Sequence, residues 1–154
     1  MSQQTTKSWA FVIFQVILLI LIVFGPNFWN VRSSNYITSI LALLLSLIGI
    51  LIVFRATLDI KKVMSVFPVP KSPGGASYKG LYSYVRHPMY SGVLLFCLGV
   101  IVLDLSLFKL FLLAILFILF YFKSNYEETL LVEVNPDYSK YKNKTPRFIP
   151  RFRR

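Results

Sequence analysis

A nearly continuous apolar block at residues 88–122 restricts the fold of this chain more than any other feature. Only Asp104 and Lys109 carry a charge within it. As one straight helix the block would be about 52 Å long, whereas the hydrocarbon core of a bilayer is about 30 Å thick. We therefore predict two short helices, at residues 88–103 and 106–123, that form a tight hairpin. Asp104 or Ser106 can cap the second helix by accepting from its free backbone N–H groups.

Two further apolar stretches have the length of membrane spans, at residues 9–29 and 37–54. Neither shows the alternation of a half-buried β-strand, and a backbone in lipid must satisfy its own hydrogen bonds, which favours helices. A cleaved signal peptide is the alternative for the first stretch, but residues 24–27 offer no small-x-small cleavage site. The prediction is an all-α integral membrane protein with four transmembrane helices in a single domain.

The composition excludes several classes of protein. Hydrophobic residues make up 56% of the 154 residues, which excludes disorder, and the single Cys97 excludes a disulfide scaffold. The net charge is +11. With four spans, 15 of the 17 basic residues fall on the side of the termini and the long loop. The positive-inside rule then places both termini in the cytoplasm, at a bacterial inner membrane or the endoplasmic reticulum.

The basic side is expected to face anionic lipid headgroups, which attract nearby Lys and Arg side chains. Nucleic-acid binding is the rival explanation of so basic a chain. The sequence contains no recognisable nucleic-acid-binding module, and we expect neither a nucleic-acid partner nor a bound metal.

The predicted cytosolic loop, residues 55–87, ends in a motif that can attract an anion. Pro88 suits the first turn of a helix, because its missing N–H costs no hydrogen bond there. The positive end of that helix then lies beside Arg86 and His87. A simple positive-inside anchor is the alternative interpretation.

The predicted cytosolic C-terminal segment, residues 124–154, contains two adjacent acids. The last helix is expected to continue through Glu127 and Glu128 to near Val134, because Asn135-Pro136 stops it. Neighbouring side chains on a helix project about 100° apart, so we expect at most one of the two acids to face a given pocket. A solvated helix face is the alternative.

Beyond this helix, Tyr138 and Tyr141 have i, i+3 spacing. This spacing predicts a short amphipathic helix lying on the membrane interface. Residues 147–150 are expected to end it.

Several short motifs follow one another along residues 68–150. They are Gly80-x-Tyr82, Arg86-His87-Pro88-x-Tyr90-x-Gly92, Glu127-Glu128, Asp137-Tyr138-x-x-Tyr141 and Pro146-Arg147-Phe148-Ile149-Pro150. In this order they resemble the isoprenylcysteine carboxyl methyltransferase family and the related phospholipid N-methyltransferases, which are membrane enzymes that use S-adenosylmethionine. Asn135-Pro136 departs from the pattern, because many relatives have a Gly before the acidic-Tyr pair.

The resemblance implies that S-adenosylmethionine binds at the cytosolic mouth of the hairpin and leaves as S-adenosylhomocysteine. The implied cofactor-binding residues are Tyr82, His87, Pro88, Tyr90 and Glu128. His87 would contact the methionine carboxylate, and Glu128, with Glu127 near it, would hold the amino group or other polar parts of the cofactor. Arg147 and the final segment would close a lid or form the substrate mouth.

The candidate catalytic residues are Arg86, Glu127 and Arg147. Glu127 or a nearby Tyr could assist proton removal from an ammonium acceptor, whereas a carboxylate or thiolate acceptor needs no base. Arg86 or Arg147 could pair with a carboxylate or phosphate of the acceptor.

The predicted function is therefore methylation of a hydrophobic or lipid-like acceptor, such as a prenylated one, that enters from the bilayer. The sequence has no glycine-rich Rossmann fingerprint. Two alternatives stay open. Sterol-reductase-like enzymes share part of the motif set and use a nicotinamide cofactor, but they usually carry Asn where this chain has Met89. A non-enzymatic scaffold or lipid-binding protein would bind anionic lipid and neither cofactor.

Overall fold

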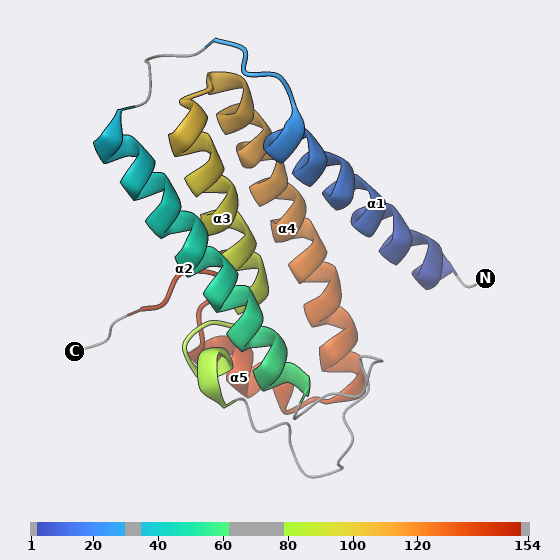
Figure 1. Cartoon of the computed structure of the whole chain (residues 1–154). Helices are drawn as coiled ribbons and strands as arrows, with labels where there is room; N and C mark the ends of the chain where they lie inside the picture. The colour runs from blue at the N-terminus through green and yellow to red at the C-terminus, as the bar shows by residue number, and fades with distance from the viewer. Residues whose placement is uncertain (1–2, 30–34, 62–78, 152–154) are drawn as a thin grey trace. The chain divides into compact units, whose positions relative to one another are not determined.

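The computed structural model describes residues 3–29, 35–61 and 79–151 (Figure 1). This part of the chain is helical and contains no β-strand, which confirms the all-α prediction for the described residues. The elements are α1 (Gln3–Phe24), α2 (Tyr36–Lys61), a short 3-10 helix η1 (Gly80–Ser83), α3 (Pro88–Asp104), α4 (Leu107–Val134) and α5 (Tyr138–Lys144). The proline- and glycine-rich part of the predicted loop, residues 62–78, lies outside the described residues.

The first two helices end at different places from those predicted. α1 ends at Phe24 and not at residue 29. The amide of Gly25 still donates to Leu21 O at 3.0 Å, but Pro26 has no N–H to continue the ladder. α2 continues past residue 54 to Lys61, so the first residues of the predicted loop 55–87 are helical.

The boundaries of α3 and α4 follow the sequence prediction closely. α3 begins at Pro88, and α4 ends at Val134, directly before Asn135-Pro136. α5 forms over the predicted tyrosine pair, but it ends at Lys144, before residues 147–150. Proline marks both of the correctly predicted ends, because its ring suits the start of a helix and excludes its continuation.

The break between α3 and α4 falls at the predicted residues. Leu105 has a φ of 49°, in the left-handed region. The Oγ of the buried Ser106 accepts from the amide of Lys109 at 3.4 Å, and the Lys109 ammonium pairs with the Asp104 carboxylate. Ser106 therefore caps α4, and Asp104 pairs with a charge in the first turn.

Among the described residues, two helices have the length and composition to cross a membrane, over Tyr36–Ile60 and Leu107–Val134. Two shorter apolar helices cover Ser8–Phe24 and Pro88–Asp104. Large apolar side chains are widely exposed on these helices; Ile37, for example, is 78% exposed. A soluble monomer rarely exposes an apolar surface of this extent. The helices thus support membrane association, and the four-span arrangement stays a prediction.

The chain forms two compact units. One consists of Met1–Ile48 and Leu94–Lys123, and the other of Gly49–Val93 and Ser124–Arg154. All the predicted site residues belong to the second unit.

Glycine allows α2 and α3 to approach closely within the second unit. A Cβ atom at Gly92 would lie 2.8 Å from both the carbonyl oxygen of Gly49 and Cγ2 of Val53. Small residues at such points are the common means by which helices in membranes pack closely. The start of α3, which carries several site residues, is thereby held against α2.

Candidate functional site

Two backbone hydrogen bonds join the segment before α3 to the C-terminal segment. The amide of Arg86 donates to Pro146 O at 2.9 Å, and the amide of His87 donates to Arg147 O at 3.0 Å. This short pairing brings Arg147 next to Arg86 and His87, although some 60 residues separate them along the sequence. These backbone hydrogen bonds hold the C-terminal segment next to the predicted site residues.

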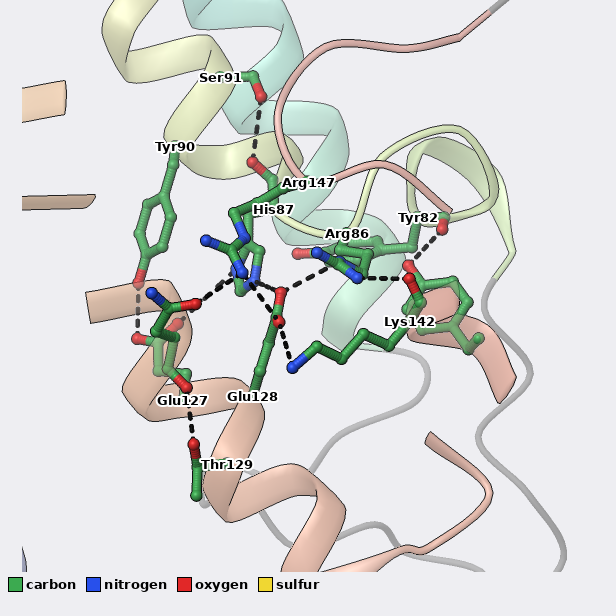
Figure 2. A network of polar contacts seen from close by, with 12 residues as sticks. Tyr82, Arg86, His87, Tyr90, Ser91, Glu127, Glu128, Thr129, Lys142 and Arg147 are labelled. Atoms are coloured by element: carbon green, nitrogen blue, oxygen red, sulfur yellow. Dashed lines mark hydrogen bonds and ion pairs between the residues drawn. The ribbon is translucent and has the colours of Figure 1, made fainter. Parts of the chain in front are cut away.

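Glu128 of α4 lies at the centre of a group of cationic side chains and is fully buried (Figure 2). Its Oε1 atom lies 3.0 Å from Nε of Arg86 and 3.0 Å from Nε2 of His87. Its Oε2 atom lies 3.3 Å from Nη2 of Arg147 and 3.3 Å from Nζ of Lys142. Burying a carboxylate is costly unless charged partners surround it, and these neighbours provide them.

Glu127 contacts the same histidine as Glu128. Its Oε2 lies 3.8 Å from Nδ1 of His87, and its Oε1 accepts from the Tyr90 hydroxyl at 2.6 Å. The two acids thus contact opposite ring nitrogens of one histidine, and of the two only Glu127 is partly exposed. The two ring nitrogens of His87 point in different directions, and long Glu side chains cover the angle between neighbouring positions on α4.

Aromatic rings enclose His87. Its ring is stacked on that of Tyr90, with centroids 5.3 Å apart and an interplanar angle of 3°. The Phe148 ring is tilted against it at 6.1 Å. The Ser91 hydroxyl donates to Phe148 O at 2.7 Å, which holds this part of the C-terminal segment beside α3.

Tyr82 and Pro88 contribute to the site through the backbone. The carbonyl of Tyr82, in η1, accepts from the Tyr141 hydroxyl at 2.5 Å. Burial, together with the negative charges of Asp59 and Glu127, raises the pKa of the Tyr82 hydroxyl to about 12. Tyr82 is therefore a neutral group close to the acids. Pro88 is buried and begins α3, where it has no amide hydrogen to donate.

Two polar residues of the site were missed from the sequence. Asn125 accepts from Nη2 of Arg147 at 2.6 Å. It precedes Glu128 by three residues and so shares a face of α4 with it, which is a signal that was available in the sequence. Lys142 is one of several basic residues in the C-terminal segment, and no local pattern distinguishes it from the others.

The charges of the cluster do not balance. Arg86, Lys142 and Arg147 are three permanent cations, while Glu127 and Glu128 are two carboxylates. With a neutral His87, the cluster carries one net positive charge. A ligand that brings a negative group to this site would neutralise that charge.

The most exposed charged groups of the cluster have opposite signs. The Glu127 side chain is 37% exposed and that of Lys142 is 40% exposed, whereas Glu128 is fully buried. The accessible side of the cluster thus offers one carboxylate and one ammonium group. This pair is suited to a zwitterion such as an amino acid.

The helices and the site define a membrane-associated protein with a buried, charged cluster beside the start of α3. Residues 37–137, about two thirds of the chain, match the family described as phospholipid methyltransferase. The chain belongs to this family, which includes the isoprenylcysteine carboxyl methyltransferases, and the predicted resemblance is confirmed. Comparison with curated proteins and with solved structures gave no match.

The matched region contains only part of the charged cluster. It includes Arg86, His87 and the two acids of α4, and it ends before Lys142 and Arg147. The family match therefore says nothing about Lys142 and Arg147, and only the structure shows that they belong to the cluster.

Proposed function

We propose that the chain is an S-adenosylmethionine-dependent methyltransferase, of the isoprenylcysteine carboxyl methyltransferase type, that acts on a hydrophobic or lipid-like acceptor. Membership of the phospholipid methyltransferase family supports a membrane methyltransferase. The observation that carries the cofactor assignment is that the cluster exposes two opposite charges, the Glu127 carboxylate next to His87 and the Lys142 ammonium next to Glu128.

The charged groups of the cluster fit the methionine part of the cofactor. Its ammonium group would meet Glu127, and its carboxylate would meet Lys142, because the cluster has an excess of positive charge. The bound cofactor supplies a methyl group on a positively charged sulfur atom. The rings of Tyr90 and Phe148, with Tyr82, would line the rest of the site.

The burial of Glu128 suggests a different role from the one that the resemblance implies. Its two carboxylate oxygens already contact three cationic side chains and the imidazole of His87. We propose that Glu128 holds Arg86, His87 and Arg147 in place, so that Glu127, and not Glu128, receives the amino group of the cofactor. A fixed arrangement of this kind favours methyl transfer by positioning the reacting groups and excluding water.

The acceptor would meet the remaining charged side chains. Arg147 is 17% exposed and Arg86 only 9%, so Arg147 is better placed to pair with an acceptor carboxylate or phosphate.

We further propose four spans with both termini in the cytoplasm. The distribution of 15 of the 17 basic residues supports this orientation. The cluster would then lie on the cytosolic side, where a polar cofactor is available, with the basic residues facing anionic headgroups. The acceptor would enter from the bilayer.

Titration of the purified protein in detergent with S-adenosylhomocysteine tests the cofactor assignment. We expect binding, and a loss of about tenfold in affinity for Glu127→Gln and for Lys142→Met, because each removes one charged contact. Glu133→Gln and Lys140→Met are matched controls, since both residues are exposed. A folded wild-type protein that does not bind S-adenosylhomocysteine contradicts the proposal, and binding of NADPH instead would favour a reductase.

A further inference from the structure

Asp59 has an unusual position in α2. It lies in the last turn, where the negative end of the helix dipole disfavours an acid. Its side chain is nevertheless buried, at 8% exposure for the residue. A buried acid at an unfavourable place in its own helix indicates that at least one of its partners lies in another element.

The main partner of Asp59 is the backbone of η1. The amide of Leu81 donates to Oδ2 of Asp59 at 3.0 Å, and Nη2 of Arg55 lies 3.3 Å from Oδ1. The first amides of a helix have no partner within it, so an acceptor from elsewhere stabilises its start. Asp59 supplies this acceptor across 22 residues of sequence.

Gly80 lets η1 approach Asp59. A Cβ atom at Gly80 would lie 2.1 Å from Oδ2 of Asp59, and the residue has a φ of +66°, which L side chains rarely adopt. The carboxylate therefore occupies the space that any side chain at Gly80 would need. Asp59 and Gly80 together determine where η1 begins.

A short, hydrogen-bonded path leads from Asp59 to the charged cluster. The amides of Tyr84 and Val85 donate to Leu81 O at 3.1 and 3.2 Å, and Arg86 follows directly. Tyr82, on the same turn, is held from its other side by the Tyr141 hydroxyl. A displacement of Leu81 would thus reach both Tyr82 and Arg86.

We propose that Asp59 is a positioning residue for the cofactor site, which holds η1 so that Tyr82 and Arg86 keep the arrangement that binds the cofactor. This inference rests on the proposed function. It also gives a role to the end of α2, a helix in which the sequence shows no family motif.

The test combines ligand binding with hydrogen exchange in detergent. Asp59→Leu removes the acceptor at similar size, whereas Asp59→Asn keeps one acceptor oxygen for Leu81. We expect Asp59→Leu to weaken S-adenosylhomocysteine binding about tenfold and to speed hydrogen exchange of the Leu81 amide. Asp59→Asn should keep most of the wild-type affinity and most of the protection of that amide. Asp137→Asn, which removes an exposed acid from the same unit, is the matched control and should change neither.

Two results would overturn the inference. Binding by Asp59→Leu that equals the wild type would show that Asp59 does not position the site. Unchanged exchange of the Leu81 amide would show that Asp59 does not hold η1. If wild-type protein fails to bind S-adenosylhomocysteine, the proposed function fails as a separate result, and the inference that depends on it falls with it.

Discussion

Oε1 of Glu128 on α4 lies 3.0 Å from Nε2 of His87, the residue directly before α3. Since Glu127 approaches the other ring nitrogen at 3.8 Å, the imidazole lies between two carboxylates. These contacts link the start of α3 to the last turns of α4 within one unit. They make Glu128 the residue on which the arrangement of the cluster most depends.

Glu128→Gln removes the buried charge and leaves its cationic neighbours uncompensated. We expect the free energy of unfolding to fall by about 3 kcal/mol. Removing one partner of a buried ion pair leaves the charge of the other partner buried without compensation. Thermal unfolding in detergent measures the loss. Glu133→Gln, at an exposed position of the same helix, should have almost no effect. Equal losses in the two variants would contradict the role given to Glu128.

Arg86→Lys tests whether a planar guanidinium is required. Arg86 donates through Nη1 to the carbonyl of Lys142 at 2.5 Å, while its Nε lies 3.0 Å from Glu128. An ammonium group cannot make both contacts in this geometry, so we expect a loss of about 1–2 kcal/mol in stability.

Arg151→Lys is the matched control for this substitution, because Arg151 is exposed. Thermal unfolding of the two variants side by side separates the local geometry from a general Arg-to-Lys effect. Full stability of Arg86→Lys would show that a single charge is sufficient at this position.

Where a proline begins or ends a helix, the sequence alone predicted the helix boundary. Pro88 and Asn135-Pro136 marked the start of α3 and the end of α4 correctly. The extension of α2 was not predicted, because the predicted loop begins at Arg55 and therefore includes Asp59. On the helix these two residues form an i, i+4 ion pair at 3.3 Å, which is compatible with continued helix.

The candidate site was predicted in part. The order of the family's motifs along the chain predicted it, and the spacing of individual residues did not. Physical patterns alone left His87 and Glu128 as an anchor and a solvated face, and only the order of motifs brought them together. Lys142 and Asp59 were missed because their contacts depend on how α5 and η1 pack against α4 and α2. No periodicity in the sequence carries that information.

Gly92→Ala tests the close approach of α2 and α3. An added methyl group would lie 2.8 Å from a backbone oxygen of Gly49, which cannot turn away as a side chain can. We expect a loss of about 1–3 kcal/mol in the free energy of unfolding. Ser139→Ala, at an exposed position, should change it by less than about 0.5 kcal/mol. A fully stable Gly92→Ala protein would show that the two helices are not in tight contact there.

Tyr82 should titrate late as the pH rises. Burial, Asp59 and Glu127 raise its pKa from 10.0 to about 12 in the folded protein. The folded state therefore keeps the proton that the unfolded state loses, so this contribution to stability is full below pH 10 and is lost as the pH rises through about 12. Subtracting the absorbance titration of Tyr82→Phe from that of the wild type should reveal a phenol with a midpoint near 12.

Tyr84→Phe, which removes the phenol hydroxyl of an exposed tyrosine two residues away, is the control for the loss of a tyrosine. A difference titration for Tyr82 with a midpoint near 10, the ordinary value for tyrosine, would contradict its placement beside the two acids.

The most direct test of the central claim is methyl transfer itself. Wild-type protein would be incubated in detergent with a total membrane extract and S-adenosylmethionine labelled on its methyl group, and the lipid-soluble products would be separated. We predict label in a lipid-soluble product, reduced at least about tenfold by Glu127→Gln and unaffected by Glu133→Gln. Folded wild-type protein that binds S-adenosylhomocysteine but transfers no label to any lipid-soluble product would contradict the account.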